Sequence, residues 1–194
     1  ETKSNLEKIF RKLKKWKKKI EKVIFLGAVK HFFSYEKGEK NIILEILLLI
    51  GNYVNRDNII LIKGNHEKMA EIADKILLDY YTQEEFAFIH GDLEIKEVFT
   101  KKISTIFMGH LHPAINLSDS QKVKSEKYKC FLEGQYKKKT IIILPSFLPT
   151  IEGTSVNEYL SDNQCFIHSK YIKNFNVYII GEKEILNFGK LKNL

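Results

Sequence analysis

The sequence predicts an α/β fold in which two stacked mixed β-sheets carry helices on their outer faces. Two observations lead to this prediction. Helical patterns alternate with short apolar, β-branched runs in the first half of the chain, and runs typical of strands follow one another in the second half. The 194 residues, 44% of them hydrophobic, are enough for a sizeable core. We expect one domain over residues 1–194 without internal repeats.

The first half is expected to hold three helices and two strands. An amphipathic helix precedes a strand at residues 23–26, because apolar side chains recur at helical spacing: Leu6, Ile9, Phe10, Leu13, Trp16 and Ile20. A second helix is expected at about 40–52, followed by a strand at 59–62. A third helix is expected to begin near His66 with this apolar face: Met69, Ile72, Ala73, Ile76 and Leu77. Asn65 would then lie at its N-terminus, where free amides favour an anion.

The second half is expected to be rich in strands. The apolar runs 86–89 and 105–108 are short and bounded by polar residues or glycine, which is typical of buried strands. The polar stretch 116–129 is interpreted as a loop or an excursion of the chain, and a strand follows at 140–144. Residues 177–186 resemble a hairpin around Gly181.

Three polar motifs each follow one of these strands. They are Gly64-Asn65-His66-Glu67, His90-Gly91-Asp92 and Gly109-His110-Leu111-His112. Because an α/β sheet gathers its ligands at the carboxyl ends of its strands, we expect the three motifs to converge in one cleft.

Each motif also has an ordinary structural explanation. Gly64-Asn65 is a good turn by itself, and a lone strand-end His90 is more often hydrogen-bonded than bound to metal. The last motif is more specific, because alternate residues of an extended segment point the same way, so that His110 and His112 can face one centre. The occurrence of all three in order, each after a strand, makes coincidence the minor explanation.

With these motifs the chain resembles the calcineurin-like metallophosphoesterase superfamily, and within it a small archaeal branch similar to DNA-repair exonuclease-related phosphoesterases. The family pattern is Asp-x-His, Gly-Asp-x-x-Asp/His, Gly-Asn-His-Asp/Glu, a strand-end His and Gly-His-x-His. Residues 27–31 match the second motif, and 144–147 and 153–157 are similar to the late segment of that branch. The resemblance covers nearly the whole chain. It implies a four-layer α/β/β/α sandwich.

The resemblance implies a two-metal hydrolase of phosphomonoesters or phosphodiesters. In that family two divalent ions, such as Mn²⁺ or Mg²⁺, lie about 3.5–4 Å apart and share a bridging hydroxide that attacks phosphorus. One ion would take the Asp-x-His pair, a bridging carboxylate and His112. The other would take the same carboxylate with Asn65, His90 and His110.

Three further residues receive roles from the same comparison. His66 would face the phosphate and protonate or stabilise the leaving oxygen, a task that suits an imidazole near neutral pH. Glu67 would orient His66. His31 occupies the family's acidic-or-His position, although a solvated loop histidine is an equally good explanation.

Two departures from the family pattern bear on activity. Ala28 occupies the place of the bridging Asp, and a methyl group cannot bind a cation. The Asp-x-His motif and its strand are absent from the sequence, so we expect an N-terminally truncated domain. Neutral amide and imidazole ligands also leave a divalent charge uncompensated. We therefore expect at most one weakly held ion and impaired catalysis.

Composition limits the remaining possibilities. The longest apolar run, 42–50, is too short to span a bilayer, and the N-terminus lacks the pattern of a secretory signal. The two cysteines, Cys130 and Cys165, show no pairing pattern, which fits a reducing compartment. We expect a cytoplasmic protein with no membrane partner, and the sequence leaves its oligomeric state open.

The net charge of +8 comes almost wholly from lysine, and residues 11–19 are mostly lysine. Compositional bias of the source and attraction of polyanionic phosphodiesters both explain it. The expected partner is a phosphoester substrate, possibly a nucleic acid or nucleotide. The competing class is a non-catalytic phosphate- or nucleic-acid-binding protein on the same scaffold.

Overall fold

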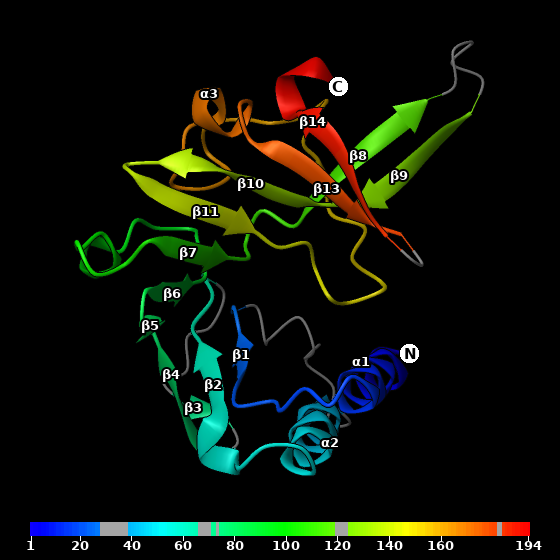
Figure 1. Ribbon diagram of the computed structural model, residues 1–194, viewed down its shortest axis with the longest axis vertical. Helices are drawn as coiled ribbons and strands as arrows, with labels where there is room; N and C mark the ends of the chain where they lie inside the picture. Colours follow the sequence, from blue (N-terminus) through cyan, green and yellow to red (C-terminus); the bar gives the residue numbers. More distant parts are fainter. Residues whose placement is uncertain (28–38, 66–70, 73, 119–123, 182–183) are drawn as a thin grey trace.

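The computed structural model describes residues 1–27, 39–65, 71–72, 74–118, 124–181 and 184–194 (Figure 1). Its strands form a four-stranded, a seven-stranded and a three-stranded sheet. In spatial order the four-stranded sheet contains β1 (Val23–Phe25), β2 (Ile59–Ile62), β4 (Lys75–Leu78) and β3 (Glu71–Ile72). The seven-stranded sheet contains β14 (Ile185–Lys190), β13 (Asn176–Ile180), β10 (Phe131–Tyr136), β11 (Lys139–Ile143), β7 (Thr105–Met108), β6 (Phe86–Ile89) and β5 (Tyr80–Gln83). The three-stranded sheet contains β12 (Thr154–Ser155), β8 (Pro113–Ser118) and β9 (Ser125–Lys129).

Few helices accompany these sheets in the described ranges. They are the α-helices α1 (Thr2–Lys15), α2 (Glu39–Gly51) and α3 (Ser169–Ile172), and the 3₁₀ turns η2 (Arg56–Asn58), η3 (Lys96–Val98) and η4 (Leu191–Asn193). Figure 1 shows α1 and α2 beside the four-stranded sheet, and α3 beside the seven-stranded sheet. The predicted mixed α/β class is confirmed, because both large sheets combine parallel and antiparallel strands. No helix in these ranges is long and apolar enough to cross a membrane.

The apolar residues form two separate cores. One lies between the four-stranded sheet and the two long helices, where Phe10 of α1 and Ile50 of α2 pack with Leu61 of β2. The other lies on the seven-stranded sheet and includes Ile106, Ile141 and other residues without exposed surface. Burial of apolar surface at about 25 cal/mol per Å² makes these two clusters the main stabilising elements of the fold.

The third helix expected near His66 is wrong for the residues that are described. Glu71–Ile72 and Lys75–Leu78 are the strands β3 and β4, and β4 pairs in parallel with β2 through Leu61↔Leu77. The period along β4 is two: Leu77 is buried, whereas Ile76 is 66% exposed. Apolar residues at 72, 76 and 77 fit a helical face equally well, so pairing with β2 decides the structure. Residues 66–70 and 73 lie outside the described residues.

A loop at 116–129 is wrong for both ends of this stretch, which are strands, whereas an excursion of the chain is compatible with them. Strand β8 includes Asn116, Leu117 and Ser118, and β9 pairs with it from Ala114↔Lys129 to Ser118↔Ser125. Strand β9 is polar because most of its side chains face solvent. A strand without apolar alternation gives no strand signal in the sequence, although cross-strand pairing stabilises it. By contrast, the predicted C-terminal hairpin is confirmed by the antiparallel pair β13 and β14.

Gly134 of β10 allows one aromatic ring to lie directly on the sheet. A Cβ at this position would lie 2.0 Å from Cδ1 of Phe175, whose side chain is 1% exposed. We expect Gly134→Ala to lower the free energy of unfolding by about 1–3 kcal/mol, the usual cost of overpacking. Urea denaturation would measure this loss. Phe175→Leu should make the same substitution less costly in a double-mutant cycle, and purely additive losses would contradict the predicted contact.

Candidate metal centre

The ends of four strands meet at one place between the two large sheets. Strands β1 and β2 run parallel in the four-stranded sheet, and β6 and β7 run parallel in the seven-stranded sheet. The carboxyl ends of β6 and β7 are tied together, since the Gly109 amide donates to the His90 carbonyl at 3.0 Å. The polar residues that follow these strands therefore come close to one another.

His90 lies at the centre of this arrangement and is 3% exposed. Its Nδ1 lies 2.7 Å from the carbonyl oxygen of Leu26, the residue after β1. A carbonyl oxygen only accepts hydrogen bonds, so Nδ1 carries the proton and donates it. In the neutral ring this leaves the lone pair on Nε2. In many metal sites a histidine is oriented in the same way: one ring N–H donates a hydrogen bond to a backbone carbonyl, and the other ring nitrogen binds the metal.

Two predicted ligands lie against that Nε2 atom. The Asn65 Oδ1 atom is 3.2 Å from it, and the His110 Nδ1 atom is 3.0 Å from it. The His90 and His110 rings meet edge to face, with centroids 4.8 Å apart. Asn65 Oδ1 and the Nε2 lone pair are both acceptors, so a proton or a cation between them relieves their repulsion.

Gly27 makes this packing possible. A Cβ on Gly27 would lie 2.4 Å from His90 Nδ1 and 2.9 Å from the Gly64 Cα, and its φ is +85°. Glycine is the residue that tolerates such a φ at no steric cost. The glycine of the second sequence motif therefore serves close packing between the two sheets, a role that the motif alone did not reveal.

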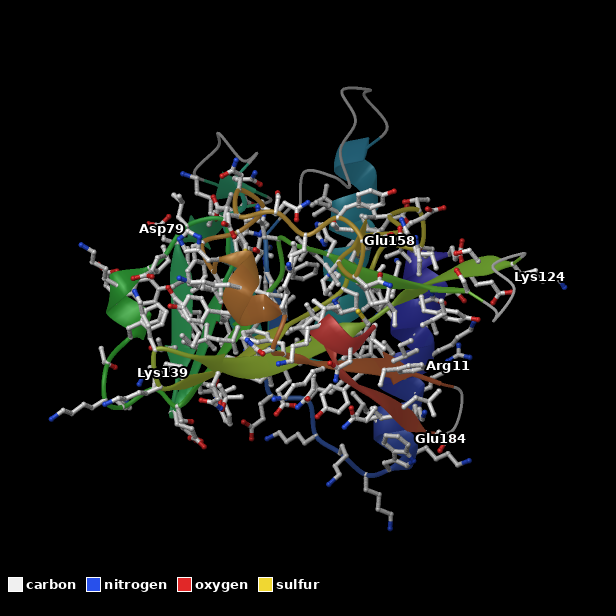
Figure 2. All side chains as sticks on the ribbon, turned by 90° about the horizontal axis from the view of Figure 1, so that it is seen from above. Arg11, Asp79, Lys124, Lys139, Glu158 and Glu184 are labelled. Carbon is white, nitrogen blue, oxygen red and sulfur yellow. The ribbon has the colours of Figure 1, made fainter. Side chains whose placement is uncertain are left out.

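A cavity of about 260 Å³ opens beside Asn65 and His90. Charged residues of both signs line it, namely Lys63, Asp79 and Asp92. Figure 2 labels Asp79. Sequence reasoning missed Asp79 as a site residue because residues 75–78 were assigned to a helix. Once they form a strand, Asp79 is itself a strand-end polar residue and the same rule would have found it.

His112 is placed differently from the other candidate ligands. The expectation that 109–112 is extended is wrong, because the φ angles of His110 and His112 are +44° and +47°. The Leu111 amide donates to the Gly109 carbonyl at 2.6 Å, which makes the segment a tight bend that buries Leu111. His112 lines a second, mainly apolar cavity of about 290 Å³ beside β1 and the start of α1.

The segment around Gly153 supports the backbone of His112. The Thr154 amide donates to the His112 carbonyl at 2.8 Å, and a Cβ on Gly153 would lie 2.3 Å from that oxygen. Strand β12 then pairs with the start of β8 through Ser155↔Ala114. The segment 153–155 therefore fixes the bend that carries the last histidine.

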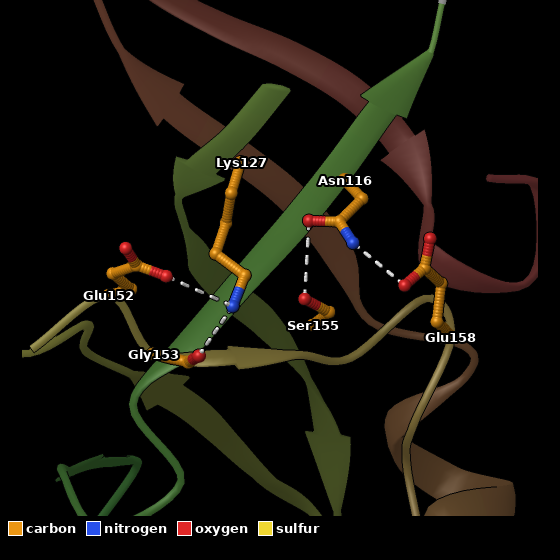
Figure 3. Close-up of polar contacts among 6 residues, drawn as sticks. All are labelled: Asn116, Lys127, Glu152, Gly153, Ser155 and Glu158. Atoms are coloured by element: carbon orange, nitrogen blue, oxygen red, sulfur yellow. Dashed lines mark hydrogen bonds and ion pairs between the residues drawn. The ribbon is translucent and has the colours of Figure 1, made fainter. Parts of the chain in front are cut away.

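Polar side chains extend this support to the β8–β9 hairpin (Figure 3). Asn116 accepts from the Ser155 hydroxyl at 3.2 Å and donates to Glu158 at 2.7 Å. Lys127 donates to the Gly153 carbonyl at 3.2 Å and lies 3.7 Å from the Glu152 carboxylate. These contacts hold the hairpin and the 152–158 segment together next to His112.

Four residues singled out in the sequence lie outside the described residues. They are Ala28, His31, His66 and Glu67. The two cysteines are buried and are poor ligands, since a metal binds the thiolate. Burial raises the pKa of the Cys130 thiol to about 12 and also raises the pKa of Cys165.

The donor set fits one divalent ion only in part. Within the described ranges, no group of three or more His, Cys, Asp or Glu side chains is arranged to hold a metal. The cluster contains two imidazoles and one amide oxygen, which are acceptable ligands for a transition metal but carry no negative charge. Asp79 and Asp92 line the adjoining cavity and bring negative charge to its walls.

Comparison with known proteins gives one positive result. The family model described as calcineurin-like phosphoesterase matches residues 2–181. Neither the curated proteins nor the solved structures gave a significant match.

Proposed function

The chain belongs to the calcineurin-like phosphoesterase family, and on this premise we propose that it hydrolyses phosphate monoesters or diesters with a bound divalent metal ion. One observation carries the proposal: two predicted ligands from different strands lie within 3.2 Å of the His90 Nε2 atom. The family membership supports the chemical class, and this contact supports the proposed position of the site.

The proposed roles rest on the contacts of the histidine cluster, on the lining of the adjoining cavity and, for His66, on the family pattern. Asn65, His90 and His110 hold the ion, and the Leu26 carbonyl keeps the His90 lone pair directed at it. A divalent ion bound there would polarise the phosphoryl group and offset the negative charge on its oxygens. Lys63, on the wall of the same cavity, attracts the anionic ester. His66, one residue after Asn65, protonates the leaving oxygen in this proposal.

A second candidate function rests on Ala28. The family pattern has a metal-bridging carboxylate at this position, and its loss leaves a phosphate-binding surface with little catalytic power. Under this alternative the chain binds phosphate or nucleotides without hydrolysing them. We retain one ion, rather than two, as the expected content of the described cluster.

The proposal is tested by Asn65→Ala, which removes an exposed ligand and should leave the fold intact. With an aryl phosphodiester and added Mn²⁺, we expect slow metal-dependent hydrolysis that falls at least about tenfold in the variant. His168→Ala is the matched control, since His168 is exposed and contacts only Asp162 among the described acidic side chains. Equal rates in wild type and Asn65→Ala would reject the assigned site. Binding of inorganic phosphate without any turnover would instead favour the alternative.

A further inference from the structure

The positive charge of this chain is concentrated in its first 22 residues. They contain ten lysines and arginines and three acidic residues, a net charge of +7, whereas the whole chain carries +8. The other 172 residues are therefore almost neutral. A compositional bias of the source would spread lysine over all exposed surfaces, so it does not explain this distribution.

Most of these cations form one surface on α1 and the turn after it. We call this the lysine surface, and it consists of Arg11, Lys12, Lys14, Lys15, Lys17, Lys18 and Lys19, all exposed. Among them only Arg11 forms an ion pair with a described residue, with Glu7 at 3.8 Å. Figure 2 shows α1 along its length, with Arg11 labelled and nitrogen-tipped side chains projecting beyond its lower end.

The backbone brings the last three lysines to the same end of the helix. The Lys18 amide donates to the Leu13 carbonyl at 2.9 Å, and Lys17 has a φ of +54°. This is a helix-ending turn in which glycine is usually favoured. Lysine at that position adds charge to the surface although glycine would fit the backbone better.

The apolar side of α1 is already used within the molecule. Phe10 is buried against Tyr53, with ring centroids 4.4 Å apart, and Leu6 packs on the same core. A helix that enters a lipid surface needs a free apolar face, and α1 keeps only Ile9 and Trp16 exposed. The positive charge favours an anionic partner, and the small free apolar area of α1 favours a soluble polyanion over a membrane.

Trp16 indicates the kind of polyanion. It is 56% exposed and lies among the lysines, with the Lys12 Nζ 4.9 Å from its ring. Aromatic rings set in a cationic groove or surface stack on unpaired bases. A duplex offers its phosphates but not its base faces.

We propose that the lysine surface binds single-stranded nucleic acid. The lysine surface covers residues 11–19, at the C-terminal end of helix α1. The first turn of the helix, with Thr2 and Leu6, borders the cavity of His112, whereas the lysine surface lies toward the other end. This binding surface is separate from the histidine cluster and does not require hydrolysis.

Trp16 is the only tryptophan in the chain, so its fluorescence reports on this surface directly. Titration with oligothymidylate in the absence of metal is expected to quench Trp16, with an affinity that falls steeply with salt. In the variant Lys14→Gln/Lys15→Gln/Lys18→Gln/Lys19→Gln, the affinity should fall about tenfold or more. The log–log salt slope should flatten by about 0.7 for each lost phosphate contact.

The matched control removes the same charge elsewhere, in Lys101→Gln/Lys102→Gln/Lys173→Gln/Lys192→Gln, and should change the affinity less than about twofold if binding is local. Equal weakening in both variants would mean that the affinity depends only on the net charge of the protein, and it would overturn the proposal. So would unchanged binding in the first variant, or binding to phosphatidylserine vesicles without binding to oligothymidylate. Hydrolysis of an aryl phosphodiester should be equal in both variants, so this test does not depend on the proposed hydrolase activity.

Discussion

Gly27→Ala is expected to lower the free energy of unfolding by about 2–5 kcal/mol. About 1–2 kcal/mol comes from a Cβ at a φ of +85°, and about 1–3 kcal/mol from its overlap with the His90 ring and the Gly64 backbone. The His90 contact joins the two large sheets and the Gly64 contact is with backbone of the same four-stranded sheet, so neither neighbour yields easily. The shift of the urea midpoint at constant slope measures the loss.

Gly189→Ala is the matched control for this variant. Gly189 has a φ of +75° and no atom within 4 Å of the position of a Cβ, so its replacement carries the backbone cost alone. We expect about 1–2 kcal/mol for the control. Equal losses in the two variants would mean that His90 accommodates the methyl group and that the close packing at Gly27 is unimportant.

Ala28→Asp is expected to raise the proposed hydrolase activity. It places a carboxylate directly after Gly27, whose backbone lies against His90, and so offers charge to a ligand set of neutral groups. We expect the apparent Mn²⁺ affinity to rise at least about tenfold, and turnover of an aryl phosphodiester to rise about a hundredfold. The reason is that carboxylate oxygen offsets the charge of the ion and fixes its position.

Ala28→Asn separates charge from size in this experiment. An amide has nearly the same shape as the carboxylate but carries no charge, so it should restore little of the effect. Strong Mn²⁺-dependent turnover in the wild-type chain that Ala28→Asp leaves unchanged would disprove the proposed importance of this position. A rise in Mn²⁺ affinity without any turnover would support the non-catalytic alternative.

The sequence predicted the fold best where patterning and chain order agree. Strands β2, β6 and β7 were identified because each is a short apolar run that ends at a polar motif, and the parallel order of β6 and β7 brings His90 and His110 together. Strand β4 was assigned to a helix because Ile72, Ile76 and Leu77 recur at helical spacing, and the adjacent Ile76 and Leu77 break the alternation typical of a strand. Strand β9 was missed because its stability comes from its partner rather than from apolar alternation.

The candidate site likewise contains residues that chain order predicts and residues that it does not. Chain order was enough to group His90 and His110, since the carboxyl ends of the parallel strands β6 and β7 lie at one edge of one sheet. Asn65 follows β2 of the four-stranded sheet and reaches His90 because the two sheets meet at these strand ends. Chain order was not enough for His112, because the positive φ angles at positions 110 and 112 depend on the tight turn at Gly109 and on support from Gly153. Asp79 depended on a correct strand assignment, and the Leu26 carbonyl is a backbone contact that no side-chain motif reveals.

The position of His90 between two separate cores links their unfolding. Its ring donates to the Leu26 carbonyl and lies against Asn65 of the four-stranded side, while its backbone belongs to the seven-stranded side. A ligand that binds only when the two sides are together stabilises both by mass action. Melting of α1 and α2 and melting of the large sheet should therefore become one cooperative transition when such a ligand is bound, and should separate when it is removed.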